Sequence, residues 1–127
     1  MSHAFRIAAL LLCLLLPPLS ASAQDLYDPA TLRTIQINFH DSDWETRLRA
    51  NYASATNILA DIVVDGVTYP SVGVRIRGNT SYTALPQGSQ KFSLKVEMDF
   101  VDANQELMGY DTLNFNNGFH DPTFVRE

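Results

Sequence analysis

The chain has 127 residues, a formal net charge of −5 at pH 7 and hydrophobic residues at 46% of its positions. This length and apolar content suit one domain with a modest hydrophobic core. The acidic balance, without any Lys/Arg run, argues against a nucleic-acid partner, which needs a basic surface. Cys13 is the only cysteine, so the small disulfide-stapled class of secreted proteins is excluded.

The first 23 residues have the three parts of a cleavable signal peptide. His3 and Arg6 give a basic start, the apolar run from Ala8 to Leu16 follows, and Ala-Ser-Ala at 21–23 suits signal peptidase. The run is shorter than the ~20 residues that a membrane-spanning helix needs. We expect cleavage after Ala23, which removes Arg6 and brings the net charge to −6. The mature protein is expected to be secreted or held in the periplasm or cell envelope, with no transmembrane span.

Residues 24–33 predict an N-terminal loop, and the first strand is expected within 32–39, where apolar and polar residues alternate. A helix over 43–52 follows, with Ser42 and Glu45 as a capping box.

A second strand is expected over 57–64 and a third over 67–77. Asp65-Gly66 between them is typical of a type I′ hairpin turn, and Pro70 indicates a sheet edge or a bulge.

Residues 78–90 predict a long loop, rich in Gly, Pro and small polar residues. A fourth strand is expected over 91–98, with Lys91, Ser93, Lys95 and Glu97 outward, and a fifth over 111–116. Asp121-Pro122 is typical of a helix start, and because only five residues follow, we expect the natural protein to continue. The predicted fold is α+β: an antiparallel sheet of about five strands with one or two helices.

Four cations project outward from neighbouring predicted strands: Arg75, Arg77, Lys91 and Lys95. On one sheet face they would form a positive patch suited to a phosphate or carboxylate. The alternative is a solvated strand face whose cations pair with Glu97 and nearby aspartates. The Gly78–Ser81 turn could offer backbone N–H groups to an anion, but the signal is weak and an ordinary turn explains it better.

The mature histidines, His40 and His120, lack the spacing of a zinc site, and no calcium-loop pattern is present. Asn79-Thr80-Ser81 forms an N-glycosylation sequon, which matters only in a eukaryotic source.

Several segments, taken in order, resemble the start of the spore coat protein H (CotH) kinase family. They are IQINFHDSDW from Ile35, ADIVVDGVTY from Ala60, VGVRIRGN from Val72, KFSLK from Lys91, LNFNN from Leu113 and DPTFVRE from Asp121. The resemblance covers residues 34–127, nearly the whole mature chain. The set is specific, although each segment alone is weak.

The resemblance implies the incomplete small lobe of an exported, atypical protein kinase that uses ATP and Mg²⁺ to phosphorylate proteins on serine. It implies a nucleotide-contacting lysine, best matched by Lys91 with Lys95 as the other possibility, and Arg75 and Arg77 lining the same cleft wall. Glu127 would open the helix whose glutamate pairs with the lysine in kinases. No residue of this chain matches the catalytic base or a Mg²⁺ ligand, so the chain alone is expected to be inactive.

The alternative from a different class is a non-enzymatic surface or envelope module that binds a partner through its sheet. Carbohydrate binding is a weaker third option, because the tyrosines are scattered along the sequence.

Overall fold

The computed structural model describes residues 25–120; the expected signal peptide and the expected helix start at Asp121 lie outside this range. Its five strands form one sheet in the order β1-β2-β3-β4-β5, with every neighbouring pair antiparallel. They are β1 (Ile35–Phe39), β2 (Ile58–Val64), β3 (Val67–Ile76), β4 (Leu94–Glu97) and β5 (Thr112–Phe115). Two helices accompany them, α1 (Trp44–Ala50) and α2 (Thr80–Thr83). The predicted α+β class and the five-stranded antiparallel sheet are confirmed.

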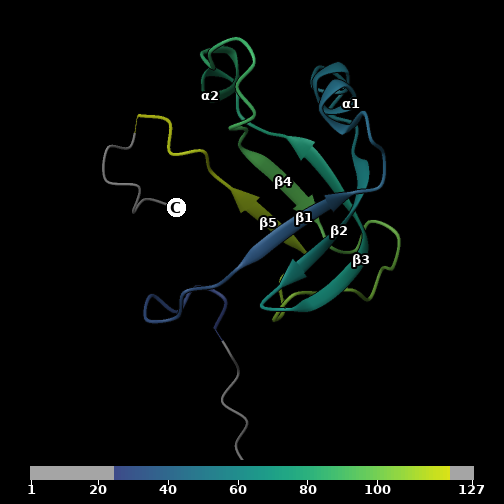
Figure 1. The fold of residues 1–127 in the computed structure, drawn as a ribbon. Helices are drawn as coiled ribbons and strands as arrows, with labels where there is room; N and C mark the ends of the chain where they lie inside the picture. Colours follow the sequence, from purple (N-terminus) through teal and green to yellow (C-terminus); the bar gives the residue numbers. More distant parts are fainter. Residues whose placement is uncertain (1–24, 121–127) are drawn as a thin grey trace, which may run out of the picture.

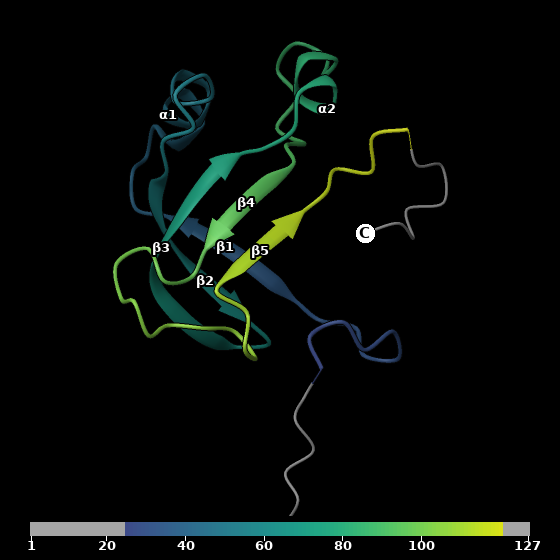
Figure 2. The same ribbon diagram turned by 180° about the vertical axis from the view of Figure 1, so that it is seen from behind.

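The sheet curls on itself, so that β1 crosses β4 and β5 in projection (Figures 1 and 2). The bend lies in the long strand β3, where Ser71 has a φ of 54° and the register with β2 shifts between Ala60 and Ile62. This is the irregularity that Pro70 predicted, because a proline cannot donate to the ladder. The strand therefore belongs to both halves of the curled sheet.

The tight turn between β2 and β3 is confirmed. Asp65 and Gly66 have φ values of 50° and 86°, as a type I′ turn requires, and Val64 lies opposite Val67.

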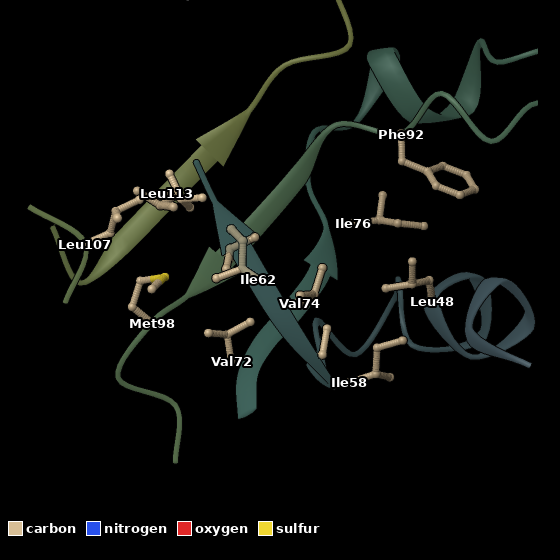
Figure 3. Close-up of a cluster of buried hydrophobic side chains, with 13 residues drawn as sticks. Leu48, Ile58, Ile62, Val72, Val74, Ile76, Phe92, Met98, Leu107 and Leu113 are labelled. Carbon is tan, nitrogen blue, oxygen red and sulfur yellow. The ribbon is translucent and has the colours of Figure 1, made fainter. Parts of the chain in front are cut away.

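The hydrophobic core lies inside the curl, where side chains from both halves of the sheet meet (Figure 3). Fully buried members include Ile62 of β2, Val72 and Val74 of β3 and Val96 of β4. Leu48 of α1 is 1% exposed and packs at the end of the core near Ile58 (Figure 3). Alternation along the strands therefore decides which residues enter the core.

The start of α1 differs from the prediction. Its N-cap is Asp43 rather than Ser42, and no side chain caps the helix. The Glu45 carboxylate instead accepts hydrogen bonds from Arg49, one turn along, and from Gln90 in the distant loop. The Glu45 side chain, which the capping-box pattern would place on the helix N-terminus, is engaged in the long-range contact with Gln90 instead.

Two further predictions need correction. Residues 78–90 are not loop throughout, because they contain the short helix α2. The fourth strand begins at Leu94 and not at Lys91. Ser93, expected to face outward, is only 5% exposed, and its Oγ accepts a hydrogen bond from the Asn117 N–H at 3.1 Å.

Candidate anion-binding face

The face of β3, β4 and β5 that points away from the core carries polar residues in the strand register, and we call it the cation face. Figure 2 shows how these three strands lie side by side. In the register of the sheet, Arg75 lies opposite Lys95, and Lys95 lies opposite Asn114. Arg77 follows Arg75 by two residues and so shares its side of the chain. The strand pairing thus brings three of the four predicted cations, Arg75, Arg77 and Lys95, to one face.

Lys95 is held by a carboxylate on its own strand. Its Nζ lies 2.7 Å from Oε1 of Glu97, and both side chains are about one-quarter exposed. The other carboxylate oxygen of Glu97 accepts a hydrogen bond from Asn57 Nδ2 at 2.8 Å. The hydrogen bond from Lys95 lowers the pKa of Glu97 most strongly. Burial opposes that shift, and the Asn57 hydrogen bond and the charges of Lys95 and Arg75 add to it. Glu97 therefore stays ionised and orients the lysine ammonium.

Arg75 differs from Lys95, because its guanidinium has no acceptor within the described range. The side chain is half-buried and close enough to Glu97 for their charges to interact, yet no residue in 25–120 hydrogen-bonds or ion-pairs with it. A guanidinium carries five N–H donors in a planar fork that suits phosphate or carboxylate oxygens. This half-buried donor set is the strongest indication of an anion site.

The Arg77 side chain extends from the end of β3, past β4, to the residue that follows β5. Its Nη1 donates to Asn116 Oδ1 at 2.7 Å, and its backbone N–H donates to the Ser93 carbonyl. The Arg77 side chain therefore reaches the free edge of the sheet.

Lys91 lies before β4 in an exposed position, so it does not stand in the row of strand residues. Its place is set by Asn117, which is 8% exposed. The Asn117 amide donates to the carbonyls of Ser81 and Lys91 at 3.0 and 3.1 Å. One buried side chain thus ties α2, the segment before β4 and the turn after β5 together.

An aromatic ring covers the end of the cation face at Gly73. A Cβ built on Gly73 would come within 2.6 Å of Phe100 Cγ and 2.9 Å of Asn57 Nδ2. Phe100 itself remains 45% exposed. Glycine is favoured here because any side chain would have to displace the ring and the amide.

Two surface hollows in the described range have linings that include none of the four cations. The first, about 410 Å³, lies between β5 and the segment before β1, and we call it the β5 groove. The second, about 560 Å³, lies between α1 and the residues after α2, lined by Glu45, Arg49 and Tyr82 among others. Arg77 hydrogen-bonds Asn116, which is one of the residues that line the β5 groove.

Of the two histidines, His40 binds a carboxylate, with its Nε2 2.7 Å from Asp61 Oδ1. Asp61 also accepts the Ser71 N–H, and that bond, followed by the one from His40, lowers the pKa of Asp61. Residues 25–120 hold no cluster of three His, Asp, Glu or Cys residues that could bind a metal ion. The same range has no helix long and apolar enough to cross a bilayer.

Sequence reasoning placed Glu97 on the outward face but missed Asn57 and Asn117. Alternation reveals Glu97, since it lies two residues after Lys95. Asn57 precedes β2 and Asn117 follows β5, where no periodicity marks a side chain as buried or paired. Searches against family models, curated proteins and solved structures found no match for this chain.

Proposed function

We propose that this chain is the nucleotide-binding small lobe of an exported, CotH-like atypical protein kinase, with the cation face as one wall of the nucleotide cleft. The observation that carries the proposal is the half-buried Arg75 guanidinium, which lacks an acceptor within 25–120 and lies opposite Lys95 across β3 and β4. The resemblance over residues 34–127 supplies the identity of the anion, the phosphates of ATP.

The cation face would act on ATP by electrostatic attraction. Cations that contact the phosphates of ATP neutralise charge and hold the transferred group in place. A lysine oriented by a carboxylate is the arrangement that protein kinases use for this purpose, and Lys95 with Glu97 at 2.7 Å has it. The carboxylate here comes from the same strand and not from a helix. Lys95 therefore matches this role better than Lys91, which the resemblance alone favours.

Mg²⁺ would bridge the phosphates and supply further charge neutralisation when bound. We assign no residue of this chain to hold it, and none to act as the catalytic base. Because phosphoryl transfer depends on that positioning, we expect this chain to bind nucleotide weakly and to transfer nothing by itself. The protein substrate would meet the part of the intact kinase that carries the base.

The test is a titration of the ¹⁵N-labelled protein with Mg-ATP, followed by NMR because that method detects weak binding. We expect shifts on β3 and β4 near Arg75 and Lys95, and smaller shifts with adenosine, which has no phosphate. Arg75→Gln should lower the affinity for Mg-ATP about tenfold, as expected for a charge-assisted contact of ~1.5 kcal/mol. Arg47→Gln is the matched control, because Arg47 lies on α1 and pairs with Asp43.

Equal shifts with ATP and adenosine, or equal loss of affinity in both arginine variants, would contradict the proposal. Comparing Lys91→Ala with Lys95→Ala decides which lysine contacts the nucleotide. A folded protein that shows no response to Mg-ATP on this face would favour the non-enzymatic envelope module instead.

A further inference from the structure

The β5 groove lies along one free edge of the sheet. Four consecutive residues from Leu113 to Asn116 form one side of it, and Leu26, Tyr27 and Ile35 lie among the residues opposite. The opposite wall is fastened in place, because Arg33 donates to the carbonyls of Asp25 and Leu26 and to the Asp65 carboxylate. The groove is therefore a built feature with a strand edge along its length and a mixed lining, in which Asp28 and Arg33 accompany the apolar residues.

The backbone of β5 offers unused hydrogen-bonding groups to this groove. The Met98 N–H donates to the Asp111 carbonyl, which sets the alternation of the β4–β5 ladder. In an antiparallel pair every second residue turns its N–H and C=O away from the partner strand. The backbone N–H and C=O groups of Leu113 and Phe115 therefore point toward β4. Those of Thr112 and Asn114 point toward the free edge. Residues 112–116 contain no charge or proline to block the addition of a strand.

The charges beside this edge indicate the kind of strand that fits. Lys95 lies opposite Asn114, and Arg77 already reaches Asn116 at the edge with a 2.7 Å hydrogen bond. A strand added to β5 would lie ~4.8 Å beyond β5 and ~9.6 Å from β4. Arg77, which already reaches the edge, is therefore its first positive contact, and Lys95, paired with Glu97, would have to extend across β5. Its outward side chains would meet positive charge, and its inward ones would meet Ile35 and Phe115.

The same geometry argues for a single strand and against a second copy of the chain. Residues 26–31 form the far wall of the groove, so a second copy would have to bring both its β5 edge and its own wall into the same space. An isolated extended segment has no such wall. We propose that the β5 groove binds an extended acidic peptide as a sixth strand, with apolar side chains inward and carboxylates outward toward Lys95 and Arg77.

The experiment measures binding of labelled seven-residue peptides to the purified protein by fluorescence anisotropy. One peptide alternates valine with aspartate, and the comparison peptide alternates valine with lysine. We expect the acidic peptide to bind at least tenfold more tightly, with an affinity that falls as salt rises. Equal affinities for the two peptides would overturn the proposal.

Variants test the edge itself. Asn114→Pro removes an N–H that the β4–β5 ladder does not use, and it should weaken acidic-peptide binding at least tenfold. Thr112→Pro removes the other outward N–H of β5, and because Thr112 does not line the groove we expect its loss to weaken binding less than that of Asn114 does. Unchanged binding by Asn114→Pro would refute strand addition.

Amide hydrogen exchange on the unmodified protein gives a second measurement, should the proline variant fail to fold. The acidic peptide should slow exchange at the Asn114 amide, and exchange that stays fast would overturn the proposal. Light scattering gives a third, since dimerisation through this edge would also refute a lone peptide as occupant. These measurements need no nucleotide, so their outcome is separate from that of the Mg-ATP titration.

Discussion

Replacing Gly73 with alanine tests the close packing at the end of the cation face. The new Cβ would lie 2.6 Å from Phe100 Cγ, whereas carbon atoms in contact prefer ~3.5–4.0 Å, so the ring must move by about 1 Å or swing into solvent. Phe100 is 45% exposed, so slightly more than half of its surface is buried. A phenylalanine side chain buries up to ~200 Å², and losing about half of that area costs ~2.5 kcal/mol as an upper estimate.

A lower loss of backbone conformational entropy partly offsets the destabilisation caused by displacing Phe100. Alanine loses less conformational freedom than glycine in a strand, which returns about 0.5–1 kcal/mol. We therefore expect Gly73→Ala to lower the free energy of unfolding by about 1–2 kcal/mol, and the Tm by roughly 5–15 °C for a domain of this size. Thermal unfolding followed by circular dichroism measures the change.

A double-mutant cycle with Phe100→Ala identifies the cause. Once the ring is gone, the substitution at Gly73 should cost less than about 0.5 kcal/mol, because only the Asn57 amide, 2.9 Å from the new Cβ, remains in the way. Equal costs in the two backgrounds would refute the reasoning, since they would place the strain somewhere other than the ring.

Three further predictions concern the core, the buried amide and acid stability. Leu48→Ala should destabilise the protein by about 2–5 kcal/mol in urea unfolding, whereas Leu32→Ala, at a residue 98% exposed, should change stability by less than ~0.5 kcal/mol. Asn117→Ala leaves the Ser81 and Lys91 carbonyls without their donor and should cost about 1–3 kcal/mol, with faster hydrogen exchange around α2; unchanged exchange there would contradict its bridging role. The Thr34 N–H and then Arg33 lower the pKa of Asp65, so its contribution is present above the unfolded-state value of about 3.9 and is lost as pH falls below it. Asp65→Asn should flatten the fall in Tm between about pH 5 and 2, and an unchanged slope would contradict this linkage.

The local features of the fold were readable from the sequence because short-range chemistry causes them. Alternation in β3 and β4 decides which side chains face the core, and it placed Arg75 and Lys95 on one polar face. Asp65-Gly66 predicted its turn because that pair tolerates positive φ at both positions. Pro70 likewise marked the bend, since it lacks the N–H that a regular ladder needs.

The tertiary structure alone decided the features that depend on distant partners. Glu45 does not cap its helix and instead accepts a hydrogen bond from Gln90, 45 residues away. Asn117 is buried where its amide donates to the carbonyls of Ser81 and Lys91. The β5 groove exists because the sheet curls and brings residues 26–35 beside its other edge. Periodicity carries information only about neighbours within a strand or helix, and these contacts join residues whose separation along the chain no pattern records.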